Sequence, residues 1–422
     1  MNVAEIYNKL IKFLSLRSSD LVMVSSPGRI DFLNTHQDYK GLPVVPAAIN
    51  LRCYAIGFKN ESDIVNFTSL NMFENGLNGF DSFSLSNFNL VGGGWFGDYV
   101  RSIFKVLMDS GFRIGGMDIA LWSEIPIGSG LSSSAAFEVS IVKLISEVFN
   151  LGLDKNSIAE IAYKAEHDVM GIPCGRLDQY SCSYGGMIIL YPNPPCKVEF
   201  LPSSNFLFVI VDSGIHRRIV SVHPIRQAEI NEALRILLDE IKVSEPLKSK
   251  LAYRYDKVYW MDISEDELKP YLDSLPRNLA NRLIFTIKMN VSTIYAVNLI
   301  KGFKINFNYL IRNLSSNADF KFNDTLDILG LIVNYQHMLL RDYYDVSLPE
   351  IENIRDLMLD NGAVGVKISG AGLGGAIIGL VKNVESAEKV CKACIDYGCP
   401  LAFYSNPVEG VRIESYVSPM DN

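Results

Sequence analysis

The sequence is poor in several features that mark whole classes of protein. Its 422 residues contain only seven cysteines, too few for the disulfide framework of a small secreted domain. Cys391 and Cys394 form a Cys-x-x-Cys pair, but both fall in the helical pattern of residues 384–397. No second pair completes a zinc site, so we expect buried or surface thiols at these positions.

Positive charge and long apolar runs are also scarce. The formal net charge of −8 argues against nucleic acid or an anionic membrane as the main partner. The longest apolar runs fall well short of the roughly 20 residues that cross a bilayer. Residues 1–16 have the spacing of an amphipathic helix and not the pattern of a signal peptide, so we expect a cytoplasmic protein, either a monomer or a homodimer.

What is present is the composition of a globular chain. Hydrophobic residues make up 48% and charged residues 20%, and the length allows two or three domains with hydrophobic cores. Neither an internal repeat nor a low-complexity linker interrupts the sequence. The chain is organised around residues 126–136, which read Pro-Ile-Gly-Ser-Gly-Leu-Ser-Ser-Ser-Ala-Ala.

This stretch predicts a Gly- and Ser-rich loop between a strand at 117–122 and a helix. Its glycines allow a ligand to approach the backbone, and its serines cap the helix and leave N–H groups free. Such a helix start attracts anions, phosphate above all. The alternative is an ordinary serine-capped helix, although one serine suffices for a cap and three stand here in a row. No Gly-Lys-Ser/Thr closes the loop, so it is not a Walker A motif, and it lacks a dinucleotide fingerprint.

Residues 26–41 form a second segment with unusual polarity. They mix proline, glycine and polar groups between two apolar segments, which predicts a loop with a chemical role. Arg29, His36 and Asp38 together would hold a polyhydroxylated ligand. Taken singly, Arg29 fits a surface ion pair and His36 fits a turn, so only the combination indicates a site.

Acidic residues follow the central loop at an unexpected place. Asp154 is a good N-cap for a helix over residues 155–169, yet Glu166 and Asp168 stand near its C-terminal end, where the helix dipole disfavours acids. A nearby cation would explain them, and full solvation is the alternative. Asp178 lies near the start of the next predicted helix.

Two further segments show weaker signals. Trp95 and Tyr99 lie four apart in a predicted helix at 95–108, where they either line a nucleotide base pocket or pack in the core. Residues 364–380 place two apolar strands around a Gly-rich turn, which predicts a hairpin or a backbone wall against a ligand.

Five segments resemble the motifs of the GHMP small-molecule kinases, and most closely those of the galactokinase family. They occur in the family's order and together extend along nearly the whole chain. The first is similar to the signature Pro-Gly-Arg-Val-Asn-Leu-Ile-Gly-Glu-His-Thr-Asp-Tyr. The five segments are residues 27–39, 125–138, 165–179, 337–350 and 367–375.

The resemblance implies a mixed α/β (α+β) fold of two GHMP kinase domains with the active site in the cleft between them. The N-terminal domain is expected at residues 1–200, with the sugar signature and the phosphate loop. The C-terminal domain is expected at residues 201–422, with the Gly-rich third motif. The resemblance also implies ATP, Mg²⁺ and transfer of the γ-phosphate to the anomeric (C1) hydroxyl of galactose or a galactose-like sugar.

The matched positions imply a role for each residue. Asp178 would take the proton of the hydroxyl or hold it electrostatically, and Arg29 would lie beside Asp178 and the phosphate. Ser133 and Glu166 would hold Mg²⁺. The positions expected to contact the sugar are Thr35, His36, Asp38, Asp178 and His223. The positions expected to contact ATP are Gly128, Ser129, Gly130, Leu131, Ser132, Ser133, Ser134, Ala135 and Trp95.

The departures from the family lie in the expected sugar pocket. Thr35 replaces a glutamate that accepts a hydrogen bond from the sugar's 6-hydroxyl, and His223 replaces a tyrosine that touches the sugar. Thr35 would bind the 6-hydroxyl directly or through water. Loss of the carboxylate would equally admit a hexuronate, with His223 or Arg176 as its cationic partner, or a pentose or substituted hexose.

Two alternatives to a galactose kinase therefore remain open from the sequence. One is a hexuronate 1-kinase acting on galacturonate or glucuronate. The other is a sugar- and ATP-binding regulator without turnover. Retention of Arg29, Glu166 and Asp178 favours an enzyme, because a sensor has less need of a base and a metal ligand.

Overall fold

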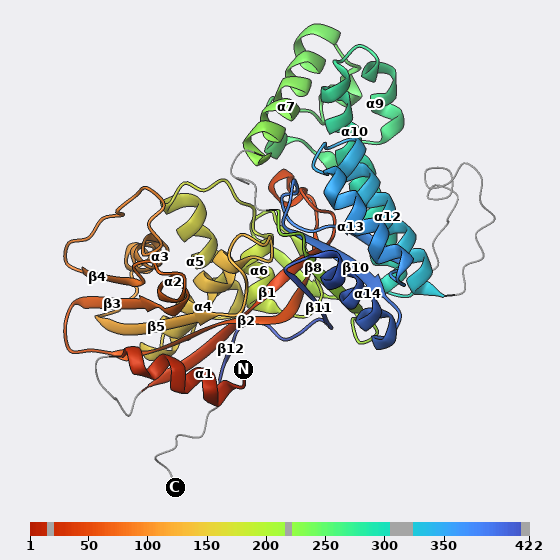
Figure 1. The fold of residues 1–422 in the computed structure, drawn as a ribbon. Helices are drawn as coiled ribbons and strands as arrows, with labels where there is room; N and C mark the ends of the chain where they lie inside the picture. The colour runs from red at the N-terminus through yellow and green to blue at the C-terminus, as the bar shows by residue number, and fades with distance from the viewer. Residues whose placement is uncertain (15–20, 216–221, 304–323, 415–422) are drawn as a thin grey trace.

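The computed structural model describes residues 1–14, 21–215, 222–303 and 324–414, which form a mixed α/β structure (Figure 1). Its larger sheet has six strands in the order β12-β1-β2-β5-β3-β4. Neighbours are antiparallel except for the pair β3–β5. The strands are β1 (Val22–Leu33), β2 (Val45–Lys59), β3 (Ile64–Ser69), β4 (Phe80–Ser84), β5 (Met117–Ser123) and β12 (Arg412–Ile413).

Helices cover both faces of this sheet (Figure 1). Alternate residues of β2 point to opposite faces: Tyr54 and Ile56 pack with α1, whereas Cys53 and Ala55 belong to the main core, in which α4 lies across β1 and β2. The helical segments are α1 (Val3–Leu10), η1 (Ile11–Phe13), η2 (Asp38–Lys40), α2 (Leu70–Glu74), α3 (Asp98–Asp109), α4 (Ser133–Val148), α5 (Lys155–Lys164), η3 (Ala165–Val169, a π-helical turn) and α6 (Leu177–Tyr184).

The rest of the chain adds a short hairpin, a second sheet and a helical lobe. The hairpin joins β6 (Ile188–Tyr191) to β7 (Lys197–Phe200). The second sheet has the antiparallel order β11-β8-β10-β9. Its strands and helices are β8 (Leu207–Asp212), β9 (Gly365–Ile368), β10 (Ala376–Val381), β11 (Leu401–Ser405), α12 (Thr325–Asp342), α13 (Pro349–Asp360) and α14 (Val384–Tyr397).

The helical lobe, residues 222–300, lies at the top of Figure 1 and has its own cluster of buried side chains. It consists of α7 (Val222–Ile236), η5 (Leu237–Ile241), α8 (Glu245–Lys248), η6 (Tyr255–Lys257), η7 (Trp260–Asp262), α9 (Glu265–Leu272) and α10 (Arg277–Ile300). By length and composition α10 could cross a membrane, but 61% of its apolar window is buried inside the protein. The sequence did not single it out, because polar residues interrupt its apolar runs.

The two sheets share one hydrophobic core. Phe32 of β1 packs edge-on against Phe208 of β8, with ring centroids 4.9 Å apart. At the far end of the chain, β12 pairs with β1, and the Glu414 amide donates to the carbonyl of Met23 over 2.8 Å. The last described residues thus return to the first sheet, and the division into 1–200 and 201–422 stays a prediction.

Local predictions from the sequence have mixed outcomes. Asp154 caps α5 by accepting from the Ser157 amide at 2.7 Å, and Cys391 and Cys394 are free thiols on α14, as expected. The predicted loop at 26–41 is wrong in its first half, because β1 continues to Leu33. Every β1 residue after Val22 is buried, so sheet pairing outweighs the turn-forming composition.

Candidate active site

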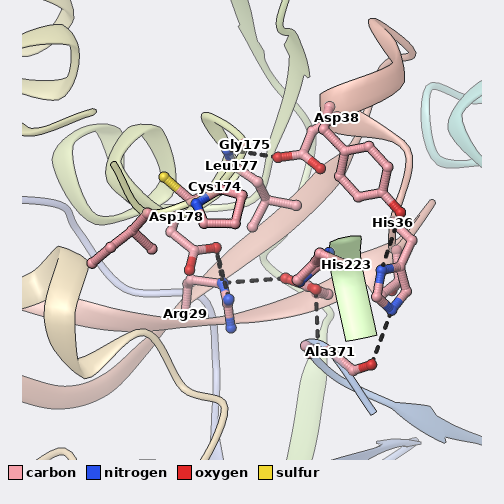
Figure 2. A pocket seen from close by; sticks show the side chains of 15 residues that line it. Arg29, His36, Asp38, Cys174, Gly175, Leu177, Asp178, His223 and Ala371 are labelled. Carbon is pink, nitrogen blue, oxygen red and sulfur yellow. Dashed lines mark hydrogen bonds and ion pairs between the residues drawn. The ribbon is translucent and has the colours of Figure 1, made fainter. Parts of the chain in front are cut away.

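A cavity of about 260 Å³ opens between the two sheets and the start of the helical lobe (Figure 2). Its walls come from four segments far apart in the sequence: β1 with the turn that follows it, the entry to α6, the start of α7, and the Gly-rich turn between β9 and β10. Among the residues predicted at the sugar, the lining includes Arg29, Thr35, His36, Asp38, Asp178 and His223.

Arg29 connects this cavity to the Gly/Ser loop. Its Nε donates to Oδ1 of Asp178 at 2.8 Å and lies 3.2 Å from Oδ1 of Asp31, while Nη1 donates to the carbonyl of Gly130 at 2.6 Å. Burial alone would lower the pKa of Arg29, but the charges of Asp178 and Asp31 outweigh it and raise the pKa. The guanidinium is therefore a permanent cation between two carboxylates, and its Nη1 binds the Gly/Ser loop at Gly130.

Two neutral imidazoles form the opposite wall. Nε2 of His36 donates to the carbonyl of Ala371 at 3.1 Å, which leaves Nδ1 as an acceptor. The His223 ring lies 5.0 Å from His36, and its Nδ1 is buried without a hydrogen-bond partner in the described chain. Burial lowers the pKa of both histidines, so neither supplies a positive charge at neutral pH.

Asp38 is a half-buried carboxylate whose partners are the backbone amides of Leu177 and Tyr39. It accepts from the Leu177 amide at 3.3 Å, and burial, followed by the charges of Asp178 and Asp31, raises its pKa to about 6. Asp38 lies directly over Gly175. A Cβ at Gly175 would stand 1.6 Å from Oδ2 of Asp38, so only glycine permits this arrangement.

Replacing Gly175 with alanine should therefore displace Asp38 from the cavity. For the sugar kinase that the sequence predicts, we expect the KM for the sugar to rise roughly tenfold or more, the effect of losing a charged hydrogen bond, with little change in the KM for ATP. Steady-state kinetics with each substrate varied will measure both values. Gly115→Ala, where a Cβ meets only an aromatic ring at 3.6 Å, is the control. An unchanged KM for the sugar would show that Asp38 does not contact it.

The Gly/Ser loop has a backbone shaped for a ligand rather than for a side-chain cap. Gly128, Gly130 and Ser132 all have positive φ. Ser132 is the N-cap residue of α4, but its hydroxyl makes no cap hydrogen bond and is buried without a partner in the described chain. The predicted serine cap is thus wrong at Ser132, because the left-handed conformation turns its side chain away from the helix.

The loop also lies against the Gly-rich turn of the second sheet. A Cβ at Gly130 would stand 3.4 Å from the Ser369 carbonyl and the Ala376 amide, and one at Gly375 would stand 3.1 Å from the Ser129 carbonyl. The Arg29 amide donates to the Leu131 carbonyl at 3.1 Å. Three of the predicted motifs therefore meet at one place, with glycines where the backbones touch.

Glu166 lies on the π-helical turn η3, behind this loop. Gln179 Nε2 donates to Oε2 of Glu166 at 2.6 Å, the Ser134 hydroxyl also bonds the carboxyl group, and burial raises the pKa of Glu166 to about 7. Ser133 is the first residue of α4 and lines the neighbouring apolar hollow. Asp168, by contrast, is exposed and pairs with His167 at 2.8 Å. Of the two acids expected near a cation, only Glu166 is buried.

The described residues contain no cluster of three or more metal-binding acids, histidines or cysteines. Buried oxygen donors nevertheless fit Mg²⁺, which commonly uses one or two carboxylates and takes its other ligands from phosphates and water. The carboxyl group of Glu166 and the serine hydroxyls at the start of α4 provide such a set.

The apolar hollow beside the loop has a volume of about 410 Å³. Phe96, Tyr99 and Phe137 contribute its aromatic walls. Trp95 does not line it: its ring packs on Phe96 at 4.7 Å, and its indole nitrogen is buried without a partner in the described chain. Of the two aromatic residues considered for a nucleotide base pocket, Tyr99 lines the hollow, whereas Trp95 packs on Phe96.

Other site residues carried little signal in the sequence. Lys367, on β9, is fully buried and donates to the Thr35 hydroxyl at 2.7 Å. Arg176, proposed as a partner for a uronate, instead pairs with Glu160 at 2.8 Å and stacks on the Tyr163 ring at 4.0 Å. It does not line the cavity of Figure 2.

Three family models match the chain. The model for the GHMP kinases N terminal domain matches residues 98–186, that for the GHMP kinases C terminal matches residues 322–398, and the galactokinase galactose-binding signature matches residues 13–58. A galactokinase of Thermococcus kodakarensis is 28% identical over 401 residues, which cover 92% of this chain and 99% of the relative. A galactokinase of Pyrococcus furiosus is 28% identical over 363 residues, covering 85% and 89%.

Solved structures confirm the fold. Galactokinase of Lactococcus lactis complexed with galactose has a TM-score of 0.78 at 23% identity, covering 97% of this chain and 99% of that one. Mevalonate kinase of Methanococcus jannaschii has a TM-score of 0.61 at 18% identity, covering 94% and 100%. The mixed α/β fold with GHMP kinase topology is therefore that expected from the sequence.

Proposed function

Because this chain belongs to the galactokinase family of the GHMP kinases, we propose that it transfers the γ-phosphate of ATP to the anomeric hydroxyl of galactose or a galactose-like hexose. The observation that carries the proposal is the position of Arg29. It holds Asp178 at the cavity of Figure 2 and the Gly130 carbonyl in the phosphate loop. A hydroxyl at Asp178 and a phosphate on the loop would meet at this guanidinium.

The geometry supports the following role for each residue. Asp178 accepts the proton of the acceptor hydroxyl or holds it electrostatically. Arg29 stabilises the negative charge of the transferring phosphoryl group. The backbone of residues 128–135 surrounds the phosphates, and the apolar hollow with Phe96 and Tyr99 receives the adenine. Asp38, His36 and the free Nδ1 of His223 bind sugar hydroxyls.

Ser133 and Glu166 would hold Mg²⁺, with Ser134 as an additional partner of Glu166. Bound Mg²⁺ neutralises charge on the phosphates. The proposal includes a cytoplasmic location, where ATP and Mg²⁺ are supplied.

The charges in the cavity favour a neutral sugar over a hexuronate. Asp31, Asp38 and Asp178 all line it, and Arg29 is already shared between two of these carboxylates. His223 is not a cation at neutral pH, because burial lowers its pKa. A sugar carboxylate would thus enter an acidic cavity without the cationic partners that the sequence suggested.

The test is ADP release from Mg-ATP with galactose, galacturonate, glucuronate, glucose, N-acetylgalactosamine and arabinose, each with and without EDTA. We expect galactose or a neutral relative to give the highest kcat/KM, and EDTA to abolish turnover. Preference for a uronate would overturn the assigned sugar class. Sugar and ATP binding without turnover would overturn the assignment as an enzyme and favour a regulator.

The raised pKa of Asp38 predicts that the kinase loses activity at acidic pH. Because this pKa is raised to about 6, the carboxyl group is protonated below pH 6 and ionised above it. An ionised carboxylate accepts stronger hydrogen bonds from sugar hydroxyls. We expect kcat/KM for the sugar to fall about tenfold per pH unit below pH 6 in the wild type. In Asp38→Asn we expect a lower but flatter profile. A wild-type profile that is flat between pH 5 and 7 would contradict this role.

A further inference from the structure

Lys367 is a buried amine that the proposed mechanism leaves unused. Its side chain extends from β9 and is fully buried. Nζ donates to the Asp31 carbonyl at 2.6 Å and to Oγ1 of Thr35 at 2.7 Å. Among the described residues no carboxylate lies within ion-pair distance of this amine. Its hydrogen bonds therefore serve to hold the cavity wall rather than to neutralise an acid.

These contacts determine the direction of the hydrogen bond that Thr35 can offer. Burial lowers the pKa of Lys367 to about 7, so below that pH the amine is an ammonium group, which has only donors. The Thr35 oxygen is thus the acceptor from Lys367, and its own O–H remains to donate. No described protein group accepts that proton. Thr35 lines the cavity of Figure 2, so the free donor is available to a ligand there.

We infer that Lys367 is a positioning residue that fixes the Thr35 hydroxyl as a hydrogen-bond donor to the sugar, so that the enzyme selects hexoses with an uncharged acceptor at this position. The inference rests on the proposed function. This cavity would then differ from one with a glutamate at position 35. A glutamate carboxylate accepts a hydrogen bond from a sugar hydroxyl, whereas the Thr35 hydroxyl donates one.

The inference predicts which substituents the cavity accepts on C6 of the sugar, the carbon that the resemblance places at Thr35. A 6-hydroxyl serves as donor or acceptor, so galactose fits. A 6-fluoro group has lone pairs but no proton, so it can accept the hydrogen bond and the fluoro sugar should still bind. A 6-ammonium group has only donors and should be rejected, since it would face both the Thr35 proton and the amine of Lys367.

The first experiment uses the wild-type enzyme, with sugar binding measured by titration calorimetry and kcat/KM by ADP release. The ligands are galactose, 6-deoxygalactose, 6-deoxy-6-fluorogalactose and 6-amino-6-deoxygalactose. We expect 6-deoxygalactose to lose about tenfold, the fluoro sugar to lose less, and the amino sugar to lose most. A fluoro sugar as weak as the deoxy sugar, or an amino sugar as good as galactose, would overturn the inference. Galactose binding without turnover would refute the proposed kinase, while the binding order would still test Thr35.

The second experiment tests whether Lys367 determines that the Thr35 hydroxyl donates its hydrogen bond to the sugar. In Lys367→Met the Thr35 hydroxyl can rotate and accept, so the penalty for the amino sugar should shrink about tenfold and the advantage of the fluoro sugar should disappear. The change should appear in KM more than in kcat. Thr35→Ser, which keeps the hydroxyl, should preserve the wild-type order, and Thr35→Val should abolish it. A purely structural role would weaken all four sugars equally, and that result would overturn the inference.

Discussion

Asp178→Asn should lower turnover by about 10²–10⁴ while ATP still binds. The amide nearly matches the carboxylate in size but cannot accept a proton, and it removes one negative charge next to Arg29. Because Asp178 stands on the first turn of α6 and its side chain is partly exposed to the cavity, the fold should tolerate the change. ADP release will measure turnover, and titration with nucleotide will measure ATP binding separately.

Asp168→Asn is the matched control for this variant. Asp168 is an acid in the same part of the chain, but it is exposed and its carboxylate pairs with His167. We expect near-normal turnover in Asp168→Asn. If Asp178→Asn keeps more than about a tenth of wild-type turnover, the general-base role of this residue is wrong.

Arg29→Met should cost both activity and stability. Removal of the guanidinium leaves the carboxylates of Asp31 and Asp178 facing each other without a cation, in a site where Arg29 is only 5% exposed. Loss of one partner of such a buried pair typically lowers the free energy of unfolding by about 3–5 kcal/mol. We also expect kcat/KM to fall by about 10³, because the positive charge that we propose for stabilising the transferring phosphate is lost.

Two further variants separate these effects. Arg29→Lys keeps the charge, but a single ammonium cannot reproduce the fork that reaches Asp178 and Gly130 together, so stability should largely recover while turnover stays low. Arg176→Met breaks a comparable arginine–carboxylate pair with Glu160 outside the cavity. It should cost stability and leave turnover within a few-fold of wild type. Normal turnover in Arg29→Met would exclude Arg29 from the chemistry.

Predictions from the sequence were most accurate where the signal is local. The Gly/Ser loop, the Asp154 cap and the Gly-rich hairpin depend on residues within one turn or strand, and the structure has all three. The predicted sugar-contact residues line one cavity because their motifs occupy known positions in the family fold. Domain limits and residue roles still depend on the resemblance.

The failures arise from small shifts in backbone geometry. The helix expected from residue 95 begins at Asp98, so Trp95 precedes it and Phe96 and Tyr99 face the hollow instead. Ser132 has the composition of an N-cap but adopts a left-handed conformation. Shifts of one to three residues turn a side chain to another face, and hydrophobic periodicity does not resolve them.

Long-range contacts explain what the sequence did not reveal at all. Lys367 and Thr35 are separated by 332 positions, and nothing near Lys367 indicates that its amine reaches the sugar cavity. Gly175 is required only because Asp38, 137 positions earlier, lies over it. Each residue gains its role from a neighbour that chain folding alone brings into contact.

The pairing of β12 with β1 has a consequence for biosynthesis. The strand that carries Arg29 has residues 412–414 as its outer neighbour, and Glu414 bonds both the Met23 carbonyl and the Ser25 hydroxyl. The ribosome synthesises these residues almost 400 positions after β1. One edge of β1 therefore lacks its partner strand during nearly the whole of translation. The strand that carries Arg29 should therefore complete its pairing only after residue 414 has left the ribosome.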